Sequence, residues 1–560
     1  MIVPFLILAL LSFPAQVNPQ HQVAAGYRIS GVVVDAVTNG PVPRAQVTIS
    51  LGNDATTTTA GDDGRFVFAG LQPGKYVLNA TAPGYVHEGY NQHGAFFVGI
   101  AVGDGRDSEH LVFRLHPQAV IHGRVMDERG EAVRGAQVLL IASDFTRGGG
   151  AKFVRAQMLT NDLGVYRFAH LLPGKYYLAV QARPWYAETQ ISVQTGQESG
   201  FAGDGRRSIL VSGSPANLDA VLDVVYPITF YPGVTDERSC TELLLGAGEQ
   251  EDANITLHAV PAARLRLTGL SEGERSWLSV GASQKVFGTL NIGLSPAGRQ
   301  ISPGEYEIAG LPPEQVTLSV ATHKENQWAS RTIEADASFG GMLDASALQA
   351  TANISGQVLL PGGAAGGRGG NVILVSTAAT TIPDTNTSLR NDGTFHFPGA
   401  QPGTYRIQVN LHAGGYYIQK VSAKNARVSG REITITDAGD VTLTVTMGQG
   451  QSQVTGVVQL GGKPAAGVMV LLAPQSGREM EEDSRMDESD SDGTFTLGGI
   501  LPGDYILLAI KDGWDLEWAK PGVLEPYLPA GQKLTIAPNQ SMKITAMAQE
   551  KTAKIEKAQQ

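Results

Sequence analysis

The 560-residue chain is short of several residue types, and each shortage excludes a class of protein. Cys240 is its only cysteine, so the chain cannot form an intrachain disulfide and is not a secreted fold stapled by disulfides. Basic residues number 42 against 53 acidic ones, which gives a formal net charge of -11 at pH 7. Because nucleic acids and acidic membrane surfaces attract clustered positive charge, we expect neither as a partner.

Several catalytic motifs are also missing. None of the 11 histidines is followed by a glutamate three positions later, so the zinc-binding pair of a metallocarboxypeptidase is absent. Neither the His-Glu-x-x-His pattern of zinc proteases nor the phosphate-binding pattern Gly-x-x-x-x-Gly-Lys-Ser/Thr occurs. The sequence therefore predicts a protein that is not an enzyme and needs no cofactor.

Long apolar runs are missing except at residues 2–13. That run has the length of the apolar part of a secretory signal peptide and is too short to span a bilayer as a helix. No lysine or arginine precedes it, and a short N-terminal strand is the alternative interpretation. We interpret residues 1–20 as a signal peptide. This predicts a secreted, periplasmic or bacterial cell-surface protein with no further membrane segment.

The chain is rich in copies of one stretch, seen most clearly at residues 62–78, Asp-Asp-Gly-Arg-Phe-Val-Phe-Ala-Gly-Leu-Gln-Pro-Gly-Lys-Tyr-Val-Leu. Four copies have a glycine followed twelve positions later by a tyrosine: Gly64 and Tyr76, Gly164 and Tyr176, Gly393 and Tyr405, Gly493 and Tyr505. A fifth copy, after Gly304, has Val316 in place of the tyrosine. These copies indicate five modules.

Each copy has the pattern of two turns and two strands. The Asp-Gly pair favours a turn, because glycine accepts a positive φ and aspartate bonds to its own backbone. Phe66 and Phe68 then alternate with polar or smaller residues, as in a strand with one buried face. Pro73 and Gly74 predict a type II turn in which the glycine has a positive φ. We therefore interpret the repeat as a folding signature and not as an active site.

Other strands surround each copy of the signature. An opening strand and a second strand precede it, and two short strands that we expect to form a closing hairpin follow it, as at residues 100–102 and 111–115. About seven short strands per module are typical of a Greek-key β-sandwich. We predict an all-β tandem array of about five Ig-like sandwiches. Their predicted bounds are 26–117, 118–260 with a loop insertion near 187–216, 261–350 (degenerate), 351–449 and 450–548, with a charged tail at 549–560.

The order of these motifs resembles a known family. Ile-Ser-Gly-Val-Val-Val at 29–34, Ala-Gln-Val-Thr-Ile at 45–49, Asp-Gly-Arg-Phe-Val-Phe at 63–68 and the stretch 70–78 look like the carboxypeptidase regulatory-like domain. That domain is a transthyretin-like, or prealbumin-like, sandwich related to carbohydrate-binding-like and starch-binding-like folds. The resemblance implies an exported, often bacterial cell-envelope setting and domains without catalytic residues.

Aromatic residues outside the repeat pattern are candidates for ligand contact. Flat aromatic rings stack on the apolar faces of sugars, so an exposed aromatic shelf would suit a polysaccharide. The alternative is that these side chains cap the open ends of the cores. The candidates are Trp514, Trp518, Tyr527, Tyr226, Tyr231 and Trp185.

The acidic segment 481–493 is the best metal candidate. Calcium prefers six to eight oxygen ligands, and Asp487, Asp490 and Asp492 could supply some of them. Glu488 and Gly499 stand where an EF-hand loop has its first aspartate and its bidentate glutamate, so a solvated charged loop is the favoured interpretation.

Taken together, the sequence favours a non-catalytic binding or scaffold protein of the cell envelope. Its predicted partner is a polysaccharide or a cell-envelope protein. A purely structural spacer, an adhesion scaffold and an accessory subunit of a peptidase are the alternatives. The short linkers between modules, as at residues 116–120, predict a semi-rigid string.

Overall fold

The computed structural model describes residues 26–106, 108–144, 148–187, 209–210, 222–270, 277–288, 290–324, 327–344, 349–363, 369–377, 385–411, 415–450, 452–475 and 480–552. The predicted signal peptide, most of the predicted insertion and the end of the charged tail lie outside these ranges. Within them, no helix is both long enough and apolar enough to cross a membrane.

Sandwich 1 establishes the pattern that recurs along the chain. Its first sheet has the order β4-β1-β8, with β1 antiparallel to β4 and parallel to β8. Its second sheet has the order β3-β2-β5-β6, and β7 also pairs with β5. The strands are β1 (Tyr27–Asp35), β2 (Gln46–Leu51), β3 (Asp54–Thr59), β4 (Arg65–Leu71), β5 (Gly74–Thr81), β6 (Glu88–Gly89), β7 (Ile100–Val102) and β8 (Leu111–Leu115).

Sandwich 2 has the orders β12-β9-β18, with β19 beside β9, and β11-β10-β13-β16, with β17 beside β13. The pair β15-β20 and the short strand β14, which pairs with β22, lead into sandwich 3. The elements are β9 (Ala119–Met126), β10 (Gln137–Asp144), β11 (Ala151–Leu159), β12 (Val165–Leu171), β13 (Gly174–Gln181), β14 (Ile209–Leu210), β15 (Val224–Val225), β16 (Thr229–Phe230), η1 (Glu237–Ser239), β17 (Leu243–Leu245), β18 (Gln250–Asp252), β19 (Ile255–Thr256) and β20 (Val260–Pro261).

Sandwich 3 contains the degenerate repeat and keeps the same central pairing, since β21 is antiparallel to β25 and parallel to β28. Its other sheet is built from long neighbouring strands, β22, β26 and β27. The elements are β21 (Ala263–Thr268), β22 (Trp277–Val286), β23 (Leu290–Leu294), β24 (Ala297–Ser302), β25 (Glu305–Leu311), β26 (Gln315–Lys324), β27 (Gln327–Asp336), η2 (Ala337–Phe339), β28 (Gly341–Asp344) and β29 (Gln349–Ala350).

Sandwich 4 pairs the sheets β33-β30-β38-β35 and β32-β31-β34-β37-β36. Its elements are β30 (Ala352–Leu359), η3 (Pro361–Gly363), β31 (Gly370–Ser376), β32 (Thr385–Ser388), β33 (Thr394–Ala400), β34 (Gly403–Leu411), β35 (Tyr416–Lys424), β36 (Arg427–Ser429), β37 (Glu432–Ile435) and β38 (Asp440–Gln449).

Sandwich 5 joins its two halves, because β46 is parallel to both β39 and β44. The elements are β39 (Ser452–Leu460), β40 (Lys463–Pro464), β41 (Met469–Pro474), α1 (Met480–Asp483), β42 (Arg485–Glu488), β43 (Thr494–Ile500), β44 (Gly503–Lys511), η4 (Leu528–Ala530), β45 (Gln532–Ile536) and β46 (Ser541–Glu550). The protein is therefore an all-β array of sandwiches.

Each sandwich has its own hydrophobic core. The five clusters draw their buried residues from separate stretches, 29–115, 119–257, 265–337, 352–447 and 454–546. Two further clusters lie outside these cores. One joins strands of sandwiches 2 and 3 and includes Phe230 and Val286, and the other covers the outer face of β41 and β44 with residues 514–527.

The turn glycine has the conformation expected from the sequence. Gly64, Gly164, Gly304, Gly393 and Gly493 have φ between 72° and 76°. A Cβ on Gly64 would stand 2.5 Å from the carbonyl oxygen of Val33, so no side chain fits there. The carbonyl of the same glycine accepts the N–H of Val33 at 2.8 Å, which ties the signature to the opening strand.

Two local predictions were wrong. Gly74 and Gly174 of the Pro-Gly pairs do not have a positive φ; the positive value occurs four residues earlier, at the β-bulge formed by Gly70 (73°) and His170 (57°). The predicted closing hairpin is not a hairpin either. β7 pairs with β5 and β8 with β1, so the chain crosses from one sheet to the other between them.

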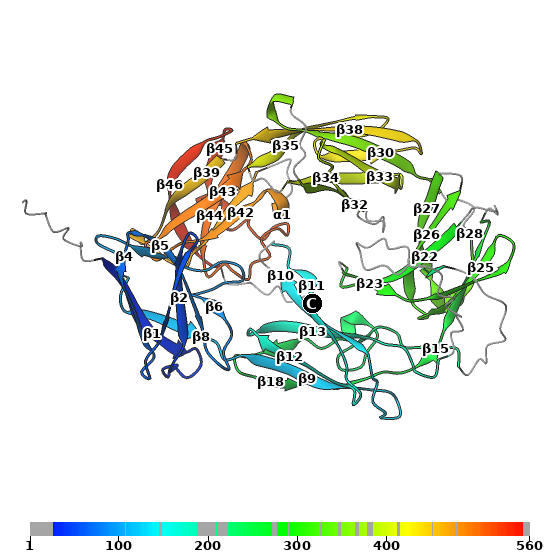
Figure 1. The fold of residues 1–560 in the computed structure, drawn as a ribbon, viewed down its shortest axis with the longest axis horizontal. Coiled ribbons are helices and arrows are strands. Elements are labelled where there is room, and N and C mark those ends of the chain that lie inside the picture. The colour runs from blue at the N-terminus through cyan, green and yellow to red at the C-terminus, as the bar shows by residue number, and fades with distance from the viewer. Residues whose placement is uncertain are drawn as a thin grey trace, which may run out of the picture.

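The five sandwiches do not lie in a line. Figure 1 shows them following one another around a closed course, so that the blue first sandwich meets the orange and red last one. Hydrogen bonds between residues about 390 to 415 positions apart join the two ends. The predicted string is therefore closed into a ring.

Candidate functional site

The acidic segment lies in the contact that closes the ring. The Asp-Gly turn before β43 directs Asp490 and Asp492 toward sandwich 1. Asp490 pairs with Lys75 through one oxygen and accepts the N–H of Gly99 through the other at 3.1 Å. Asp492 Oδ2 lies 3.0 Å from Arg106 Nε. Two of the three metal candidates are thus engaged by groups of another sandwich.

The backbone reinforces this contact. Ser491 donates its N–H to the carbonyl of Gly99 at 2.9 Å, and the N–H of Ala101 donates to Ser491 Oγ at the same distance. The turn therefore docks beside β7 through polar contacts from both partners. We call these interactions, together with the His93 and Trp514 contacts described below, the closing contact.

Asp487, the third metal candidate, is held differently. It accepts the N–H groups of Glu488 and Thr496 at 2.9 and 2.7 Å. Burial raises its pKa to about 6, and burial also raises the pKa of Glu488 and of Asp490. For Asp492 burial acts in the same direction, but bonds from Thr494 and the nearby Arg106 outweigh it and lower the pKa. Among the described residues, no three histidine, cysteine, aspartate or glutamate side chains are placed to hold a metal ion.

Trp514 lies in the closing contact and not on an open shelf. Its indole stacks on His93 with ring centroids 4.9 Å apart and planes 6° from parallel, and Phe96 lies 5.7 Å away. His93 also makes a polar contact with sandwich 5. Its Nδ1 is 2.9 Å from Oε1 of Glu488, and the Glu488 side chain is fully buried.

The remaining aromatic candidates divide by exposure. Trp518 and Tyr527 are each 3% exposed within the outer cluster of sandwich 5, and Tyr226 is 5% exposed in sandwich 2. Tyr231 packs, partly buried, against the same core as Tyr226. Trp518, Tyr527 and Tyr226 therefore offer no free ring face. Trp185 is 84% exposed and makes an edge contact with Tyr186, so it keeps the predicted accessibility.

Trp518 also helps to place sandwich 2 against sandwich 5. A Cβ on Gly148 would stand 2.3 Å from its indole, and Ala519 donates its N–H to the carbonyl of Gly148 at 2.9 Å. The glycine thus allows the ring to approach the backbone. Sandwich 5 therefore contacts both of the first two sandwiches.

The sequence reasoning missed the basic half of the closing contact. Lys75 is the second residue of β5, and His93 and Arg106 lie in connections between strands, where charged residues are ordinary surface residues. Lys175 occupies the position equivalent to Lys75 and pairs instead with Glu242 of its own sandwich, at 2.9 Å. No signal in one sequence distinguishes these two lysines.

A second missed pattern is Gly-Leu-Ser-Glu-Gly at residues 269–273, which has the Gly-x-Ser-x-Gly spacing of a nucleophile elbow. Such an elbow needs a strand followed by a helix. This segment instead connects β21 to β22, two strands. Ser271 itself lies outside the described residues.

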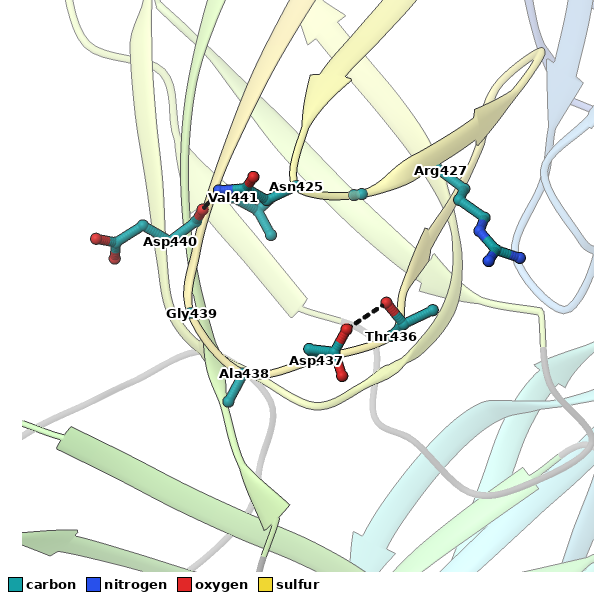
Figure 2. A pocket seen from close by; sticks show the side chains of 9 residues that line it. Asn425, Arg427, Thr436, Asp437, Ala438, Gly439, Asp440 and Val441 are labelled. Carbon is teal, nitrogen blue, oxygen red and sulfur yellow. Dashed lines mark hydrogen bonds between the residues drawn. The ribbon is translucent and has the colours of Figure 1, made fainter.

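A shallow cavity of about 470 Å³ lies at one end of sandwich 4, and Figure 2 shows side chains that line it. Its polar groups bond to one another: Asn425 donates to the carbonyl of Asp440 at 2.8 Å, and Thr436 donates to Asp437 Oδ2 at 2.9 Å. Arg427 and the two aspartates carry mixed charge. The cavity has no convergent set of groups that would select a ligand.

Comparison with known families identifies two of the sandwiches. Residues 28–113 and 120–202 match the carboxypeptidase regulatory-like domain, which confirms the resemblance predicted from the repeat. These ranges cover sandwich 1 and much of sandwich 2. No curated protein sequence matches the chain.

Similar solved structures include two pilins and one further Bacillus protein. The Bacillus anthracis TIE protein is 9% identical, with a TM-score of 0.15, over 94% of this chain and 68% of its own. GBS52, the minor pilin of Streptococcus agalactiae, is 15% identical, with a TM-score of 0.20, over 37% and 99%. The major pilin subunit BcpA of Bacillus cereus is 9% identical, with a TM-score of 0.14, over 59% and 100%. TM-scores this low show no agreement between these structures and the present one in how the sandwiches are arranged.

Proposed function

We propose that the protein is an exported, non-catalytic scaffold of the bacterial cell envelope that holds five sandwiches in a ring and binds a polysaccharide. The closing contact is the observation that carries the scaffold part. A spacer that only sets a distance needs no contact between its ends. A ring fixes the relative positions of all five sandwiches and so can present several surfaces to one extended ligand.

The closing contact has the composition of a specific interface. It combines two ion pairs, backbone hydrogen bonds and a stacked indole, and the carboxylates of Asp490 and Asp492 are only 16% and 15% exposed. Partly buried ion pairs fix register because an unpaired charge left there is costly. Export is supported by the apolar run at residues 2–13 and by the exported, cell-envelope setting that the resemblance to the carboxypeptidase regulatory-like domain implies.

Polysaccharide is the favoured ligand because of the relationship of this domain to carbohydrate-binding-like folds, an argument by analogy. Trp185 is the ring that supports it, since a sugar needs a flat aromatic face open to solvent. We expect the full chain to be retained on insoluble polysaccharide and Trp185→Ala to weaken retention several-fold. Leu244→Ala, which removes an exposed apolar side chain from the same sandwich, is the control. Equal retention of wild type and Trp185→Ala would show that Trp185 does not contact the polysaccharide. If the full chain is retained on none of the polysaccharides tested, polysaccharide binding itself is contradicted.

A protein-partner scaffold is the second candidate, and an open sheet edge favours it. β11 is a terminal strand of its sheet and exposes Phe153, Val154 and Leu159. An extended peptide could add to such an edge through main-chain hydrogen bonds. Cross-linking on intact cells separates the two candidates, because a polysaccharide scaffold would yield no specific protein adduct at β11.

A further inference from the structure

We propose that the junction of sandwiches 1 and 2 holds an anion-binding pocket that takes an acidic saccharide, with the Arg44 guanidinium and the His170 imidazole as its contacts to the acid group. The cavity there has a volume of about 920 Å³. It is lined from both sandwiches, by residues of the 42–46 and 81–87 segments and by His170. The proposal narrows the polysaccharide ligand to an acidic one and in that respect rests on the proposed function.

The first observation is where Arg44 stands in the repeat. It lies two residues before β2 and has a φ of 58°. The equivalent positions of sandwiches 2, 4 and 5 are Gly135, Gly369 and Gly467, with φ of 69°, 70° and 73°. A residue with a Cβ is strained in this left-handed region, and glycine is not. Sandwich 1 therefore keeps an arginine at a position where the backbone favours glycine.

The second observation concerns His170 and is independent of the first. It occupies the bulge position of sandwich 2 with a φ of 57°, where the other sandwiches have Gly70, Gly310, Gly399 and Gly499. Arg44 and His170 thus belong to different repeat positions of different sandwiches. Both replace a left-handed glycine by a nitrogen-rich side chain, and both line this one cavity. Strained residues held by the surrounding fold are typical of ligand contacts.

The rest of the lining fits a sugar acid better than a bare ion. His87 and Gln46 add polar groups, and the apolar surfaces of Pro83 and Tyr85 could pack against the C–H face of a sugar ring. Tyr85 donates its hydroxyl hydrogen bond to Asp35 at 2.9 Å, so the Asp35 carboxylate already has a partner. Asp62 lies 3.5 Å from Arg44, but both side chains are more than 80% exposed, so an anion could displace it.

The junction is also well ordered by its own hydrogen bonds. Val86 donates its N–H to the carbonyl of His116 at 3.0 Å, and Gln118 donates to the carbonyl of Gly84 at 2.9 Å. Glu88, which is buried, accepts the N–H of His116 at 2.9 Å. These bonds tie the 84–88 segment to the linker that enters β9, and β9 pairs with β12, the strand that carries His170. A preorganised pocket loses less entropy when it binds a ligand.

The test restores the repeat glycines. Arg44→Gly and His170→Gly relieve the backbone strain, so each variant should melt at the same temperature as wild type or higher. We expect calorimetry with oligogalacturonate to show binding to the full chain and about tenfold weaker binding to the double variant. The matched control is His110→Gly, which removes another left-handed histidine, at φ 63°, that does not line the pocket. Added salt should weaken the wild-type interaction.

Two further ligands distinguish this inference from the proposed function. Oligogalactose, the neutral counterpart, should bind at least tenfold more weakly than oligogalacturonate. Equal binding of the two sugars, or unchanged affinity in the double variant, overturns the acidic pocket while leaving a polysaccharide scaffold in place. A third outcome is that the chain binds tripolyphosphate but neither sugar, and that the double variant does not bind tripolyphosphate. This result would show an anion site at the pocket, but it would overturn the acidic saccharide as its ligand and a polysaccharide function there.

Discussion

At the scale of single residues, the signature tyrosine stabilises the turn before its strand through a hydrogen bond. Tyr76, Tyr176, Tyr405 and Tyr505 each donate the phenol O–H to the backbone carbonyl four residues earlier, at 2.7 to 3.1 Å. The phenols are buried, and burial raises the pKa of Tyr176. The hydroxyl thus satisfies a carbonyl of the turn that precedes the strand.

Removing one such hydroxyl should loosen one sandwich. We expect Tyr405→Phe to destabilise sandwich 4 by about 1–3 kcal/mol, because the carbonyl of Gln401 loses its partner in a partly buried place. Hydrogen exchange measured on β34 should rise accordingly. Tyr186→Phe, at a residue near the surface, is the control, and equal exchange in both variants would contradict the assignment. Val316 in sandwich 3 shows that the fold forms without the tyrosine.

Asp487 makes a prediction about pH. Burial raises its pKa to about 6, whereas the pKa of an exposed aspartate is about 3.9. The folded chain therefore takes up this proton first, and folded-state stability from this group increases as the pH falls from about 6 to about 4. The melting temperature of wild type relative to Asp487→Asn should rise over that range. A pH-independent difference between wild type and Asp487→Asn would refute the expectation.

At the scale of elements, strand positions could be predicted from the sequence and the pairing of the last strands could not. Alternation of Phe66 and Phe68 marks a strand with one buried face wherever it pairs. Residues 100–102 and 111–115 carry apolar residues that suit either sheet, so nothing local indicates that they belong to different sheets. The Pro-Gly pair likewise resembles a type II turn, because a one-residue bulge four positions earlier leaves no mark except Gly70.

The corrected turn geometry predicts an order among glycine substitutions in sandwich 1. Gly64→Ala should be the most harmful, since its Cβ would meet a backbone carbonyl at 2.5 Å in addition to a φ of 74°. Gly70→Ala meets no atom within 4 Å and should cost only the left-handed strain, about 1–2 kcal/mol. Gly74→Ala meets the mobile end of Leu51 at 3.1 Å and should cost least. Thermal unfolding of the three variants checks the order. A larger loss of stability for Gly74→Ala than for Gly70→Ala would contradict the bulge and favour the type II turn at Pro73 and Gly74.

At the scale of the whole molecule, ring closure could not be predicted from the sequence. Its partners are separated by about 390 to 415 positions, and its charged residues lie at strand ends, in turns or in connections, where a surface charge is common. The acidic segment stood out and suggested a metal, but its counterions are the lysine and arginine of sandwich 1. A carboxylate cluster indicates that positive charge is needed nearby. It does not show whether a metal ion or basic side chains supply that charge.

The ring itself is open to a direct test. Lys75→Glu places a carboxylate against Asp490, which is 16% exposed, so repulsion should weaken the closing contact. Combined with Trp514→Ala, which removes the stack on His93, it should separate sandwiches 1 and 5 and increase the maximum dimension measured by small-angle X-ray scattering. Lys175→Glu, at the equivalent position of sandwich 2, should leave the scattering curve unchanged because its partner lies within the same sandwich. If the double variant scatters like wild type, the closing contact does not hold the ring, and the ring then depends on the packing of Trp518 against Gly148 between sandwiches 5 and 2.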